Sequence, residues 1–415
     1  MIIHGLLLFD PDTPPAPGWI RVERGRIAEI HRTGERPPDE EPSIGGPGRL
    51  ITPGFIDAHT HPPQFGAVGC DGLQLLDWLD RVVYPAETWW GRGAAAAMMR
   101  HAKRAMLTEG TLGFAGFLTS HGEASRDALA ILERGPVIRA LVGRVAMDRR
   151  APDDLTAEDR ARMAMSPTPS IALPDSTNPR VEVSVNPRFA PTCSDELLAE
   201  AGWRVRDHPG VVVQTHLAES PAGVALVREL FPDDPHYTGV YDRFGLLTPK
   251  TLLAHCVHLA PEEWRLIAER GCVVVHCPGA NLFLRSGLFD LDAARDHGVR
   301  LALGSDLAAG PDAAMPRVAR AMIETAKARR LTNAPNAHVP TPADAWRLIT
   351  EGAADALGWS DSGRIEVGAW ADLLALRPPE TWFDERLVGR LIYNWSPGLI
   401  ETRVVGGARA DPATI

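Results

Sequence analysis

The stretch Pro-Gly-Phe-Ile-Asp-Ala-His-Thr-His at residues 53–61 constrains the fold more than any other part of the sequence. Its apolar run, 54–58, has the length of a buried strand and stops at His59 and His61. Alternate residues of an extended chain point to the same side, so both imidazoles can reach one metal ion. The sequence therefore predicts a strand that carries metal ligands at its C-terminal end.

Further along the chain, four ligand-type residues also end apolar runs: His216 after 211–215, His255 after 252–254, His276 after 273–275 and Asp306 after 300–304. Helical segments alternate with these runs, including one from Pro261 to Gly271 and one from Pro342 to Gly358. This alternation is typical of parallel βα units. Active sites of (β/α)8 barrels lie at the C-terminal ends of the strands, so we expect an α/β, TIM-like barrel with these residues at one opening.

The two ends of the chain predict a small β domain. Strand-like runs separated by Gly and Pro occupy 2–9, 19–23 and 26–30, and again 363–368, 371–376 and 402–407, while 33–47 reads as a polar connector. Neither set could bury a core alone, so both are expected to form one β-sandwich. The expected division is 1–52 and 360–415 for the sandwich, with 53–359 for the barrel.

Composition excludes several classes of function. The formal net charge of -10 argues against binding to a phosphate backbone, so no nucleic acid partner is expected. No apolar run approaches the roughly 18 residues of a membrane span, and the N-terminus lacks a signal-peptide pattern. The five cysteines form no C-x-x-C pair and are expected to be reduced thiols. These features predict a cytoplasmic protein that does not bind membranes.

The predicted metal ligands are His59, His61, His216 and Asp306. Three neutral imidazoles and one carboxylate leave room for a water, which is the open arrangement of a hydrolytic zinc site. Zinc lowers the pKa of a bound water to about 7, and Fe²⁺ is the alternative ion. Because 181–189 contains no lysine that could bridge two ions, one metal is expected.

Glu219 and His255 are the candidate acid–base residues. Glu219 lies three residues after His216, where a carboxylate can carry protons between nucleophile and substrate. The alternative is a solvated residue in the first turn of a helix. His255 could hydrogen-bond the attacking water or the developing tetrahedral centre, act as a fifth ligand, or support the ligands from behind.

Three further residues indicate the shape of the substrate. Arg188 and Phe189 directly follow the predicted strand 181–185, and a planar fork of donors beside an aromatic face suits a flat heterocycle with a carbonyl group. Gln64 adds an amide that both donates and accepts. Together they predict a pocket for a nucleobase-like small molecule.

With these motifs assembled, the chain resembles the amidohydrolase superfamily and, within it, the guanine deaminase family. The resemblance covers most of the chain and rests on 53–64, Leu-Asp-Trp-Leu at 76–79, Tyr-Pro-Ala-Glu at 84–87, 187–194, 215–220, 253–256, His-Cys-Pro at 276–278, Asn-Leu-Phe-Leu at 281–284 and Gly-Ser-Asp at 304–306. It implies a deformed (β/α)8 barrel with a β-sandwich from both termini, one zinc ion, a homodimer, and hydrolysis of guanine to xanthine and ammonia.

The resemblance also implies a role for each site residue. Asp306 and Glu219 would move protons to the ring and the leaving amine, and His255 would assist the attack. Arg188 would contact the purine carbonyl, Gln64 the ring edge, and Phe189 would pack against the ring.

The sequence departs from the family pattern at Arg285, at 307–311 and in the Pro- and Ser-rich segment 151–179, where only 156–165 is expected to be helical. These changes are expected near the pocket mouth, so they bear on the choice of substrate. The alternatives are therefore a related aminohydrolase or chlorohydrolase acting on a pterin, an oxidised purine or an s-triazine, and, from another class, a non-catalytic barrel that serves as a binding or assembly protein.

Overall fold

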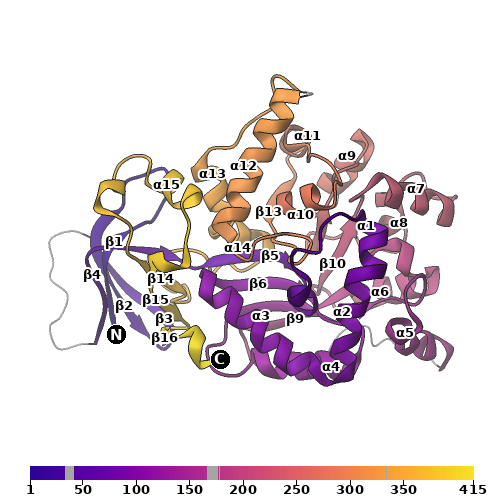
Figure 1. Ribbon diagram of the computed structural model, residues 1–415, viewed down its shortest axis with the longest axis horizontal. Coiled ribbons are helices and arrows are strands. Elements are labelled where there is room, and N and C mark those ends of the chain that lie inside the picture. The colour runs from indigo at the N-terminus through magenta and orange to yellow at the C-terminus, as the bar shows by residue number, and fades with distance from the viewer. Residues whose placement is uncertain (33–41, 166–175, 177, 333) are drawn as a thin grey trace.

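The computed structural model describes the whole chain except residues 33–41, 166–175, 177 and 333. Its strands form two sheets that lie end to end, with the terminal sheet at one end of the molecule and the barrel at the other (Figure 1). Among the described residues, no helix has both the length and the apolar character needed to cross a membrane.

The barrel is a nine-stranded sheet in which the main strands run parallel in the order β13-β12-β11-β10-β9-β7-β6-β5, with β8 paired to β9. The bounds are β5 (Phe55–Thr60), β6 (Thr111–Phe117), β7 (Arg139–Gly143), β8 (Val145–Ala146), β9 (Val181–Pro187), β10 (Val212–Leu217), β11 (Thr251–His255), β12 (Val273–His276) and β13 (Arg300–Leu303). The chain after β13 returns to β5, where the Asp306 backbone N–H donates to the His59 carbonyl oxygen at 2.8 Å. The predicted (β/α)8 class is confirmed.

Helices on the outside of the barrel follow the strands: α3 (Ala95–Glu109), α4 (Gly122–Leu132), α6 (Asp195–Asp207), α7 (Pro221–Leu230), α8 (Tyr237–Arg243), α9 (Pro261–Glu269), α11 (Leu291–Asp296) and α12 (Met315–Thr332). Two of them are the next long helices after strands whose C-terminal ends carry site residues. Ser194 caps α6 by accepting from the Leu197 N–H, and Ser220 caps α7 by accepting from the Gly223 N–H. These caps fix the starts of α6 and α7 and so limit the loops that follow Arg188 and the β10 end that carries His216.

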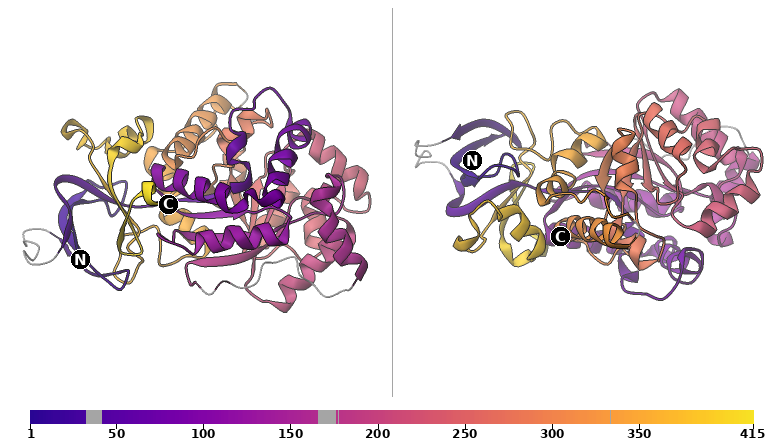
Figure 2. Two further views of the ribbon diagram at one scale, coloured as in Figure 1. Left: turned by 60° about the horizontal axis from the view of Figure 1, so that its bottom comes forward. Right: turned by 90° about the horizontal axis from the view of Figure 1, so that it is seen from above.

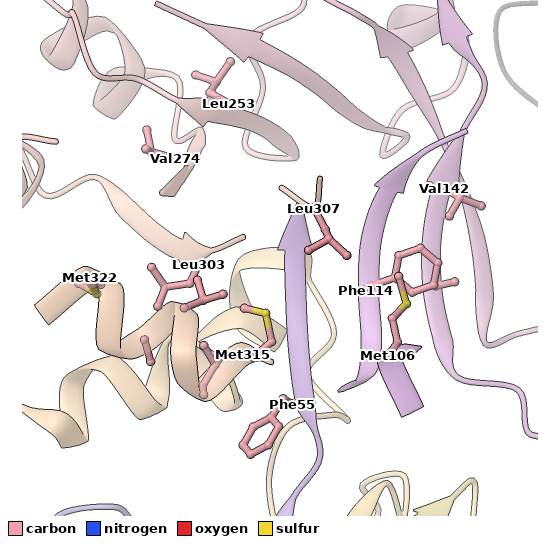
Figure 3. Close-up of a cluster of buried hydrophobic side chains, with 14 of the residues drawn as sticks. Phe55, Met106, Phe114, Val142, Leu253, Val274, Leu303, Leu307, Met315 and Met322 are labelled. Carbon is pink, nitrogen blue, oxygen red and sulfur yellow. The ribbon is translucent and has the colours of Figure 1, made fainter. Parts of the chain in front are cut away.

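The barrel strands are buried on both faces. In β12, Val274 belongs to one apolar cluster, whereas Val273 and Val275 belong to another, as the period of two in a strand requires. Figure 3 shows part of the first cluster, in which Met315 at the start of α12 lies next to strand β5. This packing gives the strand ends a rigid base.

The terminal sheet has seven strands in the order β16-β15-β14-β4-β1-β2-β3. The bounds are β1 (Ile2–Leu7), β2 (Ala16–Glu23), β3 (Arg26–Arg32), β4 (Ser43–Pro53), β14 (Leu373–Leu376), β15 (Ile400–Val405) and β16 (Ala408–Ala410). Strand β4 pairs with β1 on one side and β14 on the other, so both ends of the chain share one sheet (Figure 2). The β domain from both termini is confirmed.

The terminal sheet is tied to the barrel by a buried ion pair. Arg180, just before β9, donates from Nη2 to both carboxylate oxygens of Asp372 at 2.8 Å, and both side chains are buried. Asp372 also accepts from the Gly406 N–H at 2.7 Å.

Two local predictions are wrong. Residues 363–368 form no strand, and the nearby pairing is an isolated bridge between Arg26 and Trp370. The helix expected from Pro342 to Gly358 is two helices, α13 (Pro342–Arg347) and α14 (Glu351–Leu357), because Thr350 leaves the helical region at φ -130°. The predicted connector 33–47 overlaps β4 at its C-terminal end, and its residues 33–41 lie outside the described part of the chain.

Short elements cover the C-terminal end of the barrel. Between β5 and α3 lie η1 (Pro62–Ala67), α1 (Leu75–Trp78), η2 (Leu79–Val83), α2 (Tyr84–Trp89) and η3 (Trp90–Ala94), and after β12 comes α10 (Pro278–Phe283). Helix α5 (Asp153–Met165) is the helical piece predicted in 151–179, three residues longer at its start; of the remainder of that segment, 166–175 and 177 lie outside the described residues. Helix α15 (Leu387–Tyr393) precedes β15.

Candidate active site

The histidines and the carboxylate predicted from the strand ends meet at one point. His61 Nε2 lies 3.3 Å from His59 Nε2, 3.2 Å from His216 Nε2 and 3.4 Å from Asp306 Oδ1. Ligand atoms of His59, His216, His255 and Asp306 also lie within 4.8 Å of one another. The structure therefore brings together five of the six predicted strand-end residues, from β5, β10, β11 and the loop after β13. The sixth, His276, stacks on the Phe289 ring instead, with ring centroids 4.5 Å apart.

Backbone and side-chain contacts orient two of these rings. His216 Nδ1 lies 2.7 Å from the carbonyl oxygen of Arg188, and His255 Nδ1 lies 2.9 Å from Asn281 Oδ1. Each acceptor requires Nδ1 to carry the proton, which leaves the Nε2 lone pair of each ring free. His255 and Asp306 have positive φ angles of 71° and 47°, a strained conformation that is common at functional sites.

Burial sets the charge state of the cluster. Desolvation lowers the pKa of His59, His61 and His216 well below its usual value, and neighbouring positive groups lower it further. Desolvation raises the pKa of Asp306 to about 6. Neutral imidazoles with free lone pairs beside a carboxylate form a donor set that suits a divalent transition metal, and zinc in particular.

Glu219 lies beside this cluster and is buried, not solvated. Its Oε2 is 3.5 Å from His255 Nε2, and its Oε1 has no hydrogen-bond partner among the described residues. Burial raises the pKa of Glu219 to about 7, with His255 opposing that shift. The carboxyl group can therefore exchange a proton near neutral pH.

A cavity opens directly against these groups. Its lining includes three polar side chains (Gln64, Arg188 and Glu219) and six apolar ones (Leu75, Trp78, Leu79, Phe189, Leu284 and Ala309), in addition to His61, His216, His255 and Asp306. A small number of fixed polar groups within an apolar wall is the usual composition of a small-molecule site. All three predicted substrate-binding residues, Gln64, Arg188 and Phe189, line this cavity.

Sequence reasoning missed three supporting residues. Glu87 accepts hydrogen bonds from Gln64 and Arg188, Asn281 accepts from His255, and Asp57 accepts from the backbone N–H groups of His59 and Ser305. Burial raises the pKa of Asp57 to about 7. All three residues fall inside the quoted motifs, but no role was predicted for them. Asp57 lies two residues before the predicted ligand His59, and Asn281 lies in the short helix that follows β12.

One of the departures from the family pattern, the turn 307–311, reaches the cavity. Ala309 lines it, whereas Arg285 is not among the lining residues and donates from Nη2 to the Gly72 carbonyl oxygen at 3.2 Å. The Arg285 charge therefore lies outside the wall of this cavity.

Residues 50–408 match the sequence model of the amidohydrolase family. The chain belongs to the amidohydrolase family, the class that the barrel and the strand-end cluster together define. Within that class it is a member of the guanine deaminase family. It is 34% identical over 336 residues to the guanine deaminase of Escherichia coli, an alignment that covers 80% of this chain and 74% of that protein.

Solved structures agree with this assignment. The guanine deaminase of C. acetobutylicum with bound guanine superposes with a TM-score of 0.84 at 27% identity, and 99% of each chain is covered. An adenosine deaminase from Xanthomonas campestris with bound zinc superposes with a TM-score of 0.81 at 25% identity, covering 100% of this chain and 95% of that one. The similarity therefore includes the terminal sheet as well as the barrel.

Proposed function

We propose that the protein is a zinc-dependent hydrolase that converts guanine and water to xanthine and ammonia. The observation that carries the proposal is the meeting of one cluster of ligand atoms with a cavity that holds a guanidinium and an amide. Membership of the guanine deaminase family and the guanine-bound relative support the same substrate.

One zinc ion would be held by His59, His61, His216 and Asp306. The fit rests on the donor set: His216 gives its Nδ1 proton to a fixed acceptor, so its Nε2 lone pair faces the Nε2 atom of His61 at 3.2 Å. When bound, zinc supplies Lewis acidity and lowers the pKa of a water molecule to about 7.

The acid–base work falls to residues of the chain. Glu219, buried and with a pKa raised to about 7, would take a proton from the attacking water and deliver it to the ring or the leaving amine. Asp306 would share this proton transfer through the oxygen that is not ligating. His255, whose Nε2 lies 3.7 Å from Asp306 Oδ2, would assist the attack by accepting a hydrogen bond at Nε2 from the attacking water or from the hydroxyl group of the tetrahedral centre.

The cavity side chains would hold the purine in place. Arg188 would donate to the ring carbonyl, Gln64 would bond the ring edge, and Phe189 would pack on the ring face. The apolar residues Trp78 and Leu79 would exclude bulk water, which strengthens each polar contact within the cavity.

We further propose a homodimer acting in the cytoplasm. The dimer rests on the family resemblance, and light scattering of the purified protein tests it directly. All five cysteines are free thiols, as in proteins of a reducing compartment.

The deciding experiment incubates the zinc-loaded protein with guanine and follows xanthine by absorbance and ammonia in the same sample. Equal amounts of xanthine and ammonia support the proposal. Turnover of a pterin or an s-triazine without turnover of guanine would replace guanine with that ring.

A further inference from the structure

Glu87 on α2 is a fully buried carboxylate that has no part in the proposed proton transfers. Its Oε1 accepts from Gln64 Nε2 at 3.0 Å and from Arg188 Nη1 at 2.8 Å, and its Oε2 accepts from the same Nη1 at 2.9 Å. One carboxylate thus joins the two polar groups that line the cavity away from the metal ligands. No solvent competes for these contacts, because Gln64 and Arg188 are also buried.

This arrangement fixes the direction of the Gln64 amide. A carboxylate paired with a guanidinium only accepts hydrogen bonds, so Gln64 must turn its Nε2 toward Glu87. The carbonyl oxygen of Gln64 is then the group left for a ligand in the cavity. The amide could take either orientation without Glu87.

The same carboxylate divides the donors of Arg188. Nη1 is committed to Glu87, whereas Nε and Nη2 make no hydrogen bond to any residue that the structure describes. Because Gln64 and Arg188 both donate to Glu87 Oε1 and both line the cavity, the amide and the guanidinium are neighbours in its wall. The cavity therefore presents one acceptor next to a pair of donors.

We propose that Glu87 is a positioning residue that sets this polarity, so that the cavity selects a lactam edge, a ring N–H adjacent to a carbonyl. The inference rests on the proposed deamination of guanine, and it identifies the edge of the ring by which guanine would be told apart from other 2-aminopurines. Guanine offers an N–H and a carbonyl side by side. 2,6-Diaminopurine carries the same 2-amino group, but it has an unprotonated ring nitrogen in place of the N–H and an amino group in place of the carbonyl. The donor of guanine thus becomes an acceptor, and its acceptor becomes a donor.

The inverted edge is rejected for a physical reason. A bare ring nitrogen would face the Gln64 carbonyl oxygen, and an amino group would face the Arg188 donors. A buried polar group that is left without a partner costs its full desolvation penalty. That cost lowers the affinity for the ligand by more than the net value of one hydrogen bond.

The test compares kcat/KM for guanine and 2,6-diaminopurine in the zinc-loaded wild type and in Glu87→Gln. An amide at position 87 both donates and accepts, so Gln64 gains a second orientation. We expect the ratio of the two kcat/KM values to fall about 10- to 100-fold, the effect of one or two charge-assisted hydrogen bonds. The loss should appear mainly as a higher KM for guanine, and zinc content should stay at the wild-type level.

The exposed carboxylate of Glu229 supplies the control, because Glu229→Gln should leave the ratio unchanged.

Repeating the Glu87→Gln measurement in a protein that already carries Gln64→Leu separates a positioning role of Glu87 from a general effect on folding. Part of the effect of Glu87 is to set the direction of the Gln64 amide, so Glu87→Gln should change the ratio less when Gln64→Leu is already present. Gln64→Leu alone removes the acceptor and lowers the ratio in a protein that retains Glu87, which keeps the inference testable if Glu87→Gln does not fold. A guanine-active wild type whose ratio is unchanged in these variants, or equal effects of Glu87→Gln in both backgrounds, would overturn the inference alone. A wild type that does not deaminate guanine would overturn the proposed function as well.

Discussion

Asp57 is expected to hold the metal site together although it does not face the cavity. Its Oδ1 accepts from the backbone N–H of Ser305 at 2.9 Å and of His59 at 3.2 Å, and its Oδ2 accepts from the Ser305 hydroxyl. These contacts join β5 to the loop after β13, and two proposed ligands, His59 and Asp306, lie within or next to them. Replacing Asp57 should therefore lower both stability and metal affinity.

The magnitude follows from the groups that lose a partner. Asp57→Ala removes the side-chain acceptor of two buried backbone N–H groups, each worth about 1–3 kcal/mol when left unsatisfied, so the free energy of unfolding should fall by about 2–6 kcal/mol. The Ser305 hydroxyl retains Thr60 Oγ1 at 3.2 Å. Asp57→Asn keeps the Oδ1 acceptor for both N–H groups and should cost only about 1 kcal/mol.

Denaturant unfolding of the metal-stripped proteins measures the stability term, and competition with a zinc chelator measures affinity. Metal-stripped samples are needed because bound zinc would add its own stabilisation. The expected order is wild type, then Asp57→Asn, then Asp57→Ala in both measurements. If Asp57→Ala matched the wild type in unfolding midpoint and zinc affinity, the tether between β5 and the loop after β13 would have no energetic role.

Three further substitutions test individual roles. Glu219→Gln should keep its zinc and lose about 100- to 10,000-fold in kcat, measured by xanthine formation, because the proton carrier is gone; normal turnover would refute that role. His216→Ala should lose most of its zinc in metal analysis, and a fully loaded variant would remove His216 from the ligand set. Arg188→Ala should lower kcat/KM for guanine about 10- to 100-fold while retaining zinc, and should also destabilise the fold because Glu87 is left buried without its cation.

The chemistry of the site was more predictable from the sequence than the framework that holds it. His59, His216 and Asp306 were recognisable because each ends a short apolar run, and the strands of a parallel barrel place such ends together. Strand β4 was missed because Gly45, Gly46, Pro47 and Gly48 interrupt its pattern. Its apolar C-terminal half becomes a strand through its pairing with β1 and β14, which a local sequence pattern does not reveal.

The supporting residues could not be found in the same way. Glu87 lies on a helix, where a carboxylate is usually solvated, and its burial depends on α2 meeting the end of β9 far along the chain. The predicted strand at 363–368 shows the opposite error. Its alternating pattern suits a strand, but the glycines at 363 and 368 have φ values of 69° and 91°, which turn the chain away from the sheet.

The most direct test of the account measures metal content and guanine turnover on one preparation as zinc is removed and returned. We expect about one zinc per chain at full loading, loss of xanthine formation in parallel with zinc as a chelator removes it, and recovery of both when zinc is restored. Full guanine turnover by a protein free of transition metal, or a zinc-loaded protein without guanine turnover, would contradict the central claim.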